Sequence, residues 1–150
     1  MSRVPTLLTA LALLAGAALM PAAAPPASAA DLARNRTNLP ALVLGTEDGD
    51  DFFVSQKELT LEGGKFYRLE ITAKGQKEYM FRAPDFMRDI WVNQIVINHL
   101  EVHPMGAPYA LEFDDQGTIS IDFVPMRTGE YTWSIKGLED KGMTGRIIVK

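Results

Sequence analysis

The residues best suited to chemistry gather in one short segment of the chain. Both histidines of the sequence, His99 and His103, fall within it, with Glu101 between them and Met105 two residues beyond the second. Imidazole suits copper, iron, zinc and nickel, carboxylate favours harder ions such as Fe(II) or Mn(II), and thioether favours Cu(I). This mixed donor set predicts a site for a copper or iron ion.

The backbone of this segment can place the donors in more than one way. If the segment is extended, side chains two residues apart share a face, and His99, Glu101 and His103 are spaced about 6.6 Å apart in pairs. A twist or bulge then lets them converge on one ion. If instead Asn98-His99 forms the corner of a hairpin, His99 belongs to the turn and Glu101 and His103 remain as the pair. The plainest interpretation is that these polar side chains only cover the solvent face of a strand.

Other chemistries lack the residues they need. The sequence has no cysteine, which excludes disulfides, thiolate nucleophiles and thiolate metal ligands. It also has no Gly-x-Ser-x-Gly motif and no glycine-rich phosphate loop, so we expect no catalytic activity. Fifteen basic residues against 19 acidic ones give a net charge of -4, which argues against nucleic acid as a partner.

The first 30 residues predict export. Arg3, an apolar run over residues 7–20 and small side chains at residues 27–30 match a cleavable secretory signal peptide. No second apolar run has the length of a membrane span, about 18 residues. We therefore expect a mature chain that begins near Asp31, lies in the periplasm and is not inserted in a membrane.

The mature chain is predicted to be a single all-β domain. Residues 31–50 indicate a leader that precedes the domain or lies against it, and residues 51–150 form the domain itself. Alternation of apolar and polar residues predicts strands at 52–54, 58–62, 66–73, 78–82, 91–97, 100–103, 109–113, 118–124, 130–135 and 146–149. Only residues 84–89 suggest a helical turn. Short strands with glycine-rich turns favour a two-sheet Greek-key β-sandwich.

Two stretches of the sequence resemble the cupredoxin family, whose fold is that of plastocyanin. The run Gly129-Glu130-Tyr131-Thr132-Trp133, followed by residues 141–149, resembles the family's closing hairpin. That hairpin carries the copper-binding Cys, His and Met, and at the family's spacing these positions hold Ile135, Leu138 and Met143.

The stretch that carries the family's first copper-binding His resembles residues 79–86, and Tyr79 stands in the position of that His. The resemblance implies the cupredoxin sandwich over residues 51–150. It does not imply the family's electron-transfer site, because a blue-copper centre needs two His and one Cys beside a weak axial Met.

The remnant of the family's copper pocket is the second candidate site. Its remaining soft donors are the thioethers of Met80 and Met143. The alternative is a packed apolar end cap, because Ile135 and Leu138 replace ligands and methionine fills irregular gaps well.

The sequence also resembles the cysteine-free cupredoxin-like proteins that bacteria encode with periplasmic iron or copper uptake components. This resemblance implies a periplasmic protein that binds or delivers copper or iron, with a periplasmic or inner-membrane transport component as its partner. The leading alternative is a metal-free interaction module on the same scaffold, and a third is a small copper oxidase that uses the His99 to His103 segment.

Overall fold

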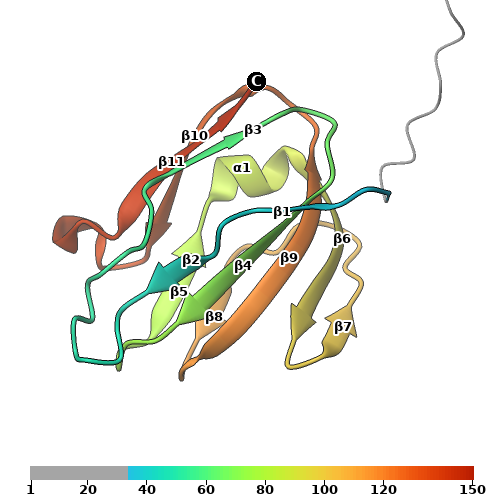
Figure 1. The fold of residues 1–150 in the computed structure, drawn as a ribbon. Helices are drawn as coiled ribbons and strands as arrows, with labels where there is room; N and C mark the ends of the chain where they lie inside the picture. The colour runs from blue at the N-terminus through green and yellow to red at the C-terminus, as the bar shows by residue number, and fades with distance from the viewer. Residues whose placement is uncertain (1–33) are drawn as a thin grey trace, which may run out of the picture.

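The structure is a computed structural model that describes residues 34–150, shown in Figure 1. The predicted signal peptide, residues 1–30, lies outside the described residues. No helix in the described part is long and apolar enough to cross a membrane.

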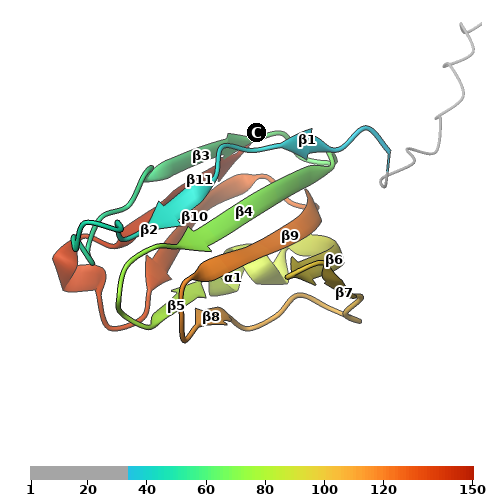
Figure 2. The ribbon, with the colours of Figure 1, turned by 60° about the horizontal axis from the view of Figure 1, so that its bottom comes forward.

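Two β-sheets form the described part of the chain, and Figures 1 and 2 show them as two layers. The first sheet has the strand order β1 (Thr37–Asn38), β4 (Tyr67–Ala73), β9 (Gly117–Pro125), β6 (Ile90–Ile97) and β7 (Leu100–Val102), and β2 (Leu42–Leu44) also pairs with β4. The second sheet has the order β3 (Glu58–Leu61), β11 (Thr144–Val149), β10 (Gly129–Ile135), β5 (Tyr79–Arg82) and β8 (Leu111–Phe113). The short helices are α1 (Pro84–Arg88) and η1 (Glu139–Lys141). The predicted all-β class and two-sheet sandwich are confirmed.

The core lies between the two sheets and follows the predicted alternation. On β10, Tyr131, Trp133 and Ile135 are buried while the residues between them are more exposed, as a strand with one face on the core requires. Trp133 stacks on Phe81 of the neighbouring strand β5, with 5.9 Å between ring centroids. The inward residues of both sheets thus form one apolar layer.

The segment predicted as a leader is hydrogen-bonded to the first sheet. Residues 37–38 and 42–44 form β1 and β2, and both pair in parallel with β4. These strands are too short for their periodicity to stand out in the sequence. The sheet therefore begins well before residue 51, and residues 52–54, predicted as a strand, make only an isolated bridge from Val54 to Leu44.

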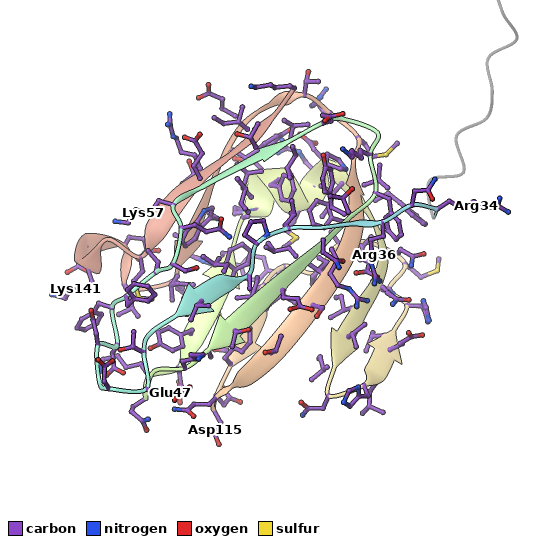
Figure 3. The ribbon with its side chains drawn as sticks, viewed as in Figure 1. Arg34, Arg36, Glu47, Lys57, Asp115 and Lys141 are labelled. Carbon is purple, nitrogen blue, oxygen red and sulfur yellow. The ribbon has the colours of Figure 1, made fainter. Side chains whose placement is uncertain are left out.

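Strand β9 is the central strand of the first sheet and is buried on both faces. Its inward side chains include Ile121 and Phe123, but Asp122 on the opposite face is only 1 % exposed. The Asp122 carboxylate accepts hydrogen bonds from Arg68 Nε at 2.6 Å and from Arg36 Nη1 at 2.8 Å. Arg36, labelled in Figure 3, reaches this carboxylate from the residue before β1. This buried ion pair joins the N-terminal strands to the middle of the sheet.

Candidate metal centre

The segment with both histidines forms a tight hairpin between β6 and β7. Ile97 pairs with Leu100, so Asn98 and His99 are the two residues of the turn, with φ angles of 48° and 67°. Positive φ at both positions is the geometry of a type I′ turn, whose twist matches that of the flanking strands. The hairpin arrangement is therefore the one the structure adopts, and His99 belongs to the turn.

Glu101 and His103 lie close together on the outer face of this hairpin. The distance from His103 Nε2 to Glu101 Oε2 is 3.6 Å. The other carboxylate oxygen of Glu101 accepts a hydrogen bond of 3.4 Å from the side-chain amide of Gln94 on β6. The alternation that places these two side chains together directs Leu100 and Val102 to the opposite face.

A main-chain carbonyl fixes the orientation of the His103 ring. The ring atom Nδ1 lies 3.2 Å from the carbonyl oxygen of Asn93, and an oxygen there can only accept. Nδ1 therefore donates to this carbonyl, and in neutral imidazole this leaves Nε2 as the nitrogen available to a metal ion. The register of β6 against β9 shifts between Val92 and Gln94, so Asn93 sits in a β-bulge beside the ring.

The free nitrogen and the carboxylate oxygen have a separation that suits a shared ion. Two ligands at about 2.1 Å from one tetrahedral ion lie about 3.4 Å apart, close to the spacing found here. A backbone carbonyl on the far nitrogen of the ring is a common second contact of metal-binding histidines. Both side chains are more than half exposed, at 63 % for His103 and 56 % for Glu101, so an ion can reach them from solvent.

The pair by itself is an incomplete site. Within residues 34–150 no group of three or more His, Cys, Asp or Glu side chains is close enough to hold a metal ion. Met105, two residues beyond His103, is fully exposed on the loop after β7. His99 lines a cleft of about 290 Å³ on the outer face of the first sheet, beside Arg68 and Ser120, and not the space between Glu101 and His103.

The second candidate site is packed with apolar side chains. Ile135 and Met143 are completely buried, and Leu138 packs against the core. Main-chain hydrogen bonds run from Ile135 N to Met143 O at 2.9 Å and from Met143 N to Leu138 O at 3.3 Å. The three residues that the resemblance aligns with cupredoxin copper ligands therefore come together here as an end cap of the core.

The other two residues of this candidate site, Tyr79 and Met80, do not complete a metal site with Met143. Tyr79 is completely buried, and its hydroxyl donates a hydrogen bond of 3.0 Å to the carbonyl oxygen of Asp51. Burial, followed by the charge of the nearby Asp51 carboxylate, raises the pKa of Tyr79. Met80, between two core residues on β5, faces away from the core that holds Met143. The structure thus does not bring the two thioethers to one site.

Comparison with known proteins gives matches in structure and none in sequence. No protein-family model matches the chain, and no curated protein matches it. The structural match with a multicopper oxidase from Pediococcus acidilactici covers 82 % of this chain and 28 % of the oxidase chain, with a TM-score of 0.57 and 17 % identity. A multicopper oxidase from Campylobacter jejuni, a metallo-oxidase, gives a TM-score of 0.54 and 10 % identity over 77 % of this chain and 30 % of its own.

A third solved structure has the same fold. The Cu-containing nitrite reductase from Thermus scotoductus gives a TM-score of 0.53 and 13 % identity over 75 % of this chain and 30 % of its own. The chain thus matches about three tenths of the length of these proteins. At these identities the likeness bears on the fold alone, and it shows that the chain is a cupredoxin-like β-sandwich.

Proposed function

We propose that this protein binds a copper or iron ion through Glu101 and His103, holds it in the periplasm and exchanges it with a metal transport component. The observation that carries the proposal is the orientation of His103. Its Nδ1 is held by the carbonyl of Asn93, and its Nε2 lies 3.6 Å from a carboxylate oxygen of Glu101. An imidazole fixed in this way presents a lone pair beside a second metal ligand.

The position of the pair supports binding and delivery over catalysis or electron transfer. Both side chains are exposed at the edge of the sheet, where a partner can take up or release the ion. A blue-copper centre needs a cysteine thiolate, and the sequence has none. The cupredoxin-like scaffold is also found in multicopper oxidases and a Cu-containing nitrite reductase. Of the three copper-ligand positions that the resemblance assigns to the closing hairpin, however, this chain keeps only Met143, beside Ile135 and Leu138.

The proposal is tested by metal analysis of the protein purified from periplasm, followed by titration with Cu(I), Cu(II) and Fe(II). The double variant Glu101→Ala/His103→Ala should bind these ions at least ~10-fold more weakly. A loss of this size is already known when only a residue that hydrogen-bonds a metal ligand is removed. The melting temperature of its metal-free form should not change, because neither side chain belongs to the core. Glu112→Ala, an exposed change on β8 in the other sheet, is the matched control.

Two results would overturn the proposal. A double variant that binds these ions as tightly as the parent would remove Glu101 and His103 from the site. Affinity that does not fall towards acid pH would do the same, because imidazole must be deprotonated to coordinate a metal ion. If the parent binds no ion at all, the metal-free interaction module is the function that remains.

That second candidate is favoured by a specific observation. Leu100, Val102 and Met105 are exposed by 71 %, 47 % and 108 %, and all three belong to β7 or the loop that follows it. A cluster of exposed apolar side chains at one edge of a sheet is typical of a surface that contacts a protein.

A further inference from the structure

Strand β7 forms an open edge of the first sheet. It is the last strand in the order of that sheet, and in Figure 1 it lies at the border of the molecule beyond β6. All three of its residues are exposed. Its shortness and the carboxylate of Glu101 limit pairing with unrelated strands, so a partner strand must offer side chains that match Glu101.

The hairpin turn determines which main-chain groups of this edge are available. In a hairpin with a two-residue turn, the residues on either side of the turn exchange hydrogen bonds, and here these are Ile97 and Leu100. The pattern alternates along an antiparallel pair. The main-chain groups of Leu100 and Val102 therefore face β6, and those of Glu101 and His103 face outward, where another strand can pair with them.

The polar side chains of β7 and the residue after it can pair with those of a second, antiparallel copy of the same segment. A two-fold axis through Val102 places Glu101 of each chain directly opposite His103 of the other. These two residues are the ones with outward main-chain groups, so both pairs can exchange hydrogen bonds. An axis through Glu101 would instead place two carboxylates opposite each other, which is unfavourable. An axis through His103 would place Glu101 opposite Met105, so only the axis through Val102 pairs each Glu101 with an imidazole.

We propose that two copies of this protein pair through their β7 strands in that register and thereby complete a four-ligand site for a copper or iron ion. This inference rests on the proposed function, since its ligands are the same Glu101 and His103. Directly opposite side chains have Cβ atoms ~5 Å apart, and residues two apart on one strand are ~6.6 Å apart. Two imidazoles and two carboxylates therefore lie within reach of one ion on the two-fold axis.

The dimer also accounts for the exposed apolar side chains on the other face of β7. On the face opposite the metal ligands, Val102 of one copy lies opposite Val102 of the second copy, and Leu100 lies opposite Pro104 of the second copy. Their exposed area is then removed from water, which contributes to association. The same pairing thus explains why one chain supplies only two metal ligands and why its edge strand is apolar.

The experiment compares assembly and metal content of the full mature chain with Cu(II) and with Fe(II). Sedimentation should show a dimer with either ion and a monomer after chelation, and metal analysis should give one ion for two chains. The electron paramagnetic resonance spectrum of the Cu(II) form should show two equivalent nitrogens, because each copy contributes one His103.

Substitutions at Val102 separate pairing from ligation. Val102 lies on the face opposite the ligands and outside the core cluster. The Val102→Lys variant places two ammonium groups opposite each other at the axis, so it should stay monomeric and bind Cu(II) at least ~10-fold more weakly, the scale known for weakened metal sites. A 1:1 mixture with the Val102→Glu variant should restore both the dimer and the affinity. Met126→Lys, at an exposed methionine after β9, is the control.

The outcomes distinguish this inference from the proposed function. A parent that binds one ion per monomer, with no loss of affinity in Val102→Lys, overturns the dimeric site and leaves the proposed function standing. A dimer that forms equally well without any ion overturns completion of the site by the second copy. A parent that binds neither Cu(II) nor Fe(II) at any chain concentration overturns both.

Discussion

The hydroxyl of Tyr79 donates a hydrogen bond of 3.0 Å to the main-chain carbonyl of Asp51. Tyr79 is the residue that the sequence resemblance aligns with the first copper-binding His of cupredoxins. Gly75 makes room for it, because a Cβ atom there would overlap the Tyr79 hydroxyl. The Tyr79 side chain thereby ties the loop after β2 to the core.

The first prediction concerns this contact. Tyr79→Phe removes the only donor that the side chain offers and leaves the partly buried carbonyl of Asp51 without this hydrogen bond. The free energy of unfolding should therefore fall by about 1 kcal/mol. Urea denaturation followed by the fluorescence of the buried Trp133 measures the change. Tyr109→Phe, at a tyrosine that is 69 % exposed, should change stability by less than about 0.5 kcal/mol. Equal losses in the two variants would contradict the role given to Tyr79.

The second prediction concerns the buried carboxylate of Asp122. Asp122→Ala leaves Arg68 and Arg36 without their counter-charge, and breaking a buried ion pair from one side costs about 3 kcal/mol. Arg36→Ala keeps the two hydrogen bonds from Arg68 to Asp122, at 2.6 and 2.9 Å. We expect that variant to lose about 1 kcal/mol or less, since Arg36 is partly exposed. Chemical denaturation of both variants should show this order, and the reverse order would contradict it.

The sequence predicted the strands of the fold well, but it did not predict which charged side chains are buried. Alternation identified β4, β9 and β10 because one face of each strand is apolar. The same alternation placed Asp122 among the outward, polar residues. Its burial depends on Arg36, a residue from a segment whose strands are only two and three residues long. No local pattern reveals a contact between residues 36 and 122.

The sequence predicted which side chains of the candidate site share a face, but not the main-chain contact that orients them, because that contact is not local. The spacing of Glu101 and His103 on a strand places them on one face, and the structure brings them to 3.6 Å. The corner at Asn98-His99 was one of two alternatives, because without glycine the turn signal is weak. The carbonyl of Asn93, which orients the His103 ring, depends on a bulge in β6 that no side-chain pattern announces.

The third prediction concerns how the stability of the fold changes as the pH falls. Hydrogen bonding from Arg88, with its charge and the hydroxyl of Tyr131, lowers the pKa of Asp89. The unfolded chain therefore takes up a proton before the folded one does as the pH falls. Asp89 thus contributes stability above the ordinary carboxyl pKa, ~3.9, and this contribution is lost as the pH falls through the lower folded value.

The Asp89→Asn variant should accordingly be less stable than the parent at neutral pH, and the difference should shrink in strong acid. Tyr131→Phe, which removes the donor 3.3 Å from Asp89 Oδ2, should show a smaller effect of the same sign. Thermal melts between pH 7 and strong acid measure both. A difference between parent and Asp89→Asn that stays constant with pH would rule out this linkage.

The fourth prediction concerns colour. The intense blue band of cupredoxins comes from a cysteine thiolate bound to Cu(II), and the sequence contains no cysteine. The protein should therefore be only weakly coloured when saturated with Cu(II), as nitrogen and oxygen ligands give weak bands. An absorption spectrum of the titrated protein is sufficient. A deep blue product would mean that the ligand set differs from the one proposed.

The position of β9 has a consequence for how the chain reaches its folded state. This strand, Gly117–Pro125, lies between β4 and β6 although both precede it in the sequence. The first sheet therefore cannot form completely until the last third of the chain has been synthesised. Until then β4 and β6 lack the strand with which both of them pair. Such non-local pairing slows folding, to milliseconds or seconds in comparable β-sandwiches. During this time the unpaired edges of β4 and β6 can pair with strands of other chains. A chaperone that shields β4 and β6 should therefore increase the yield of folded protein.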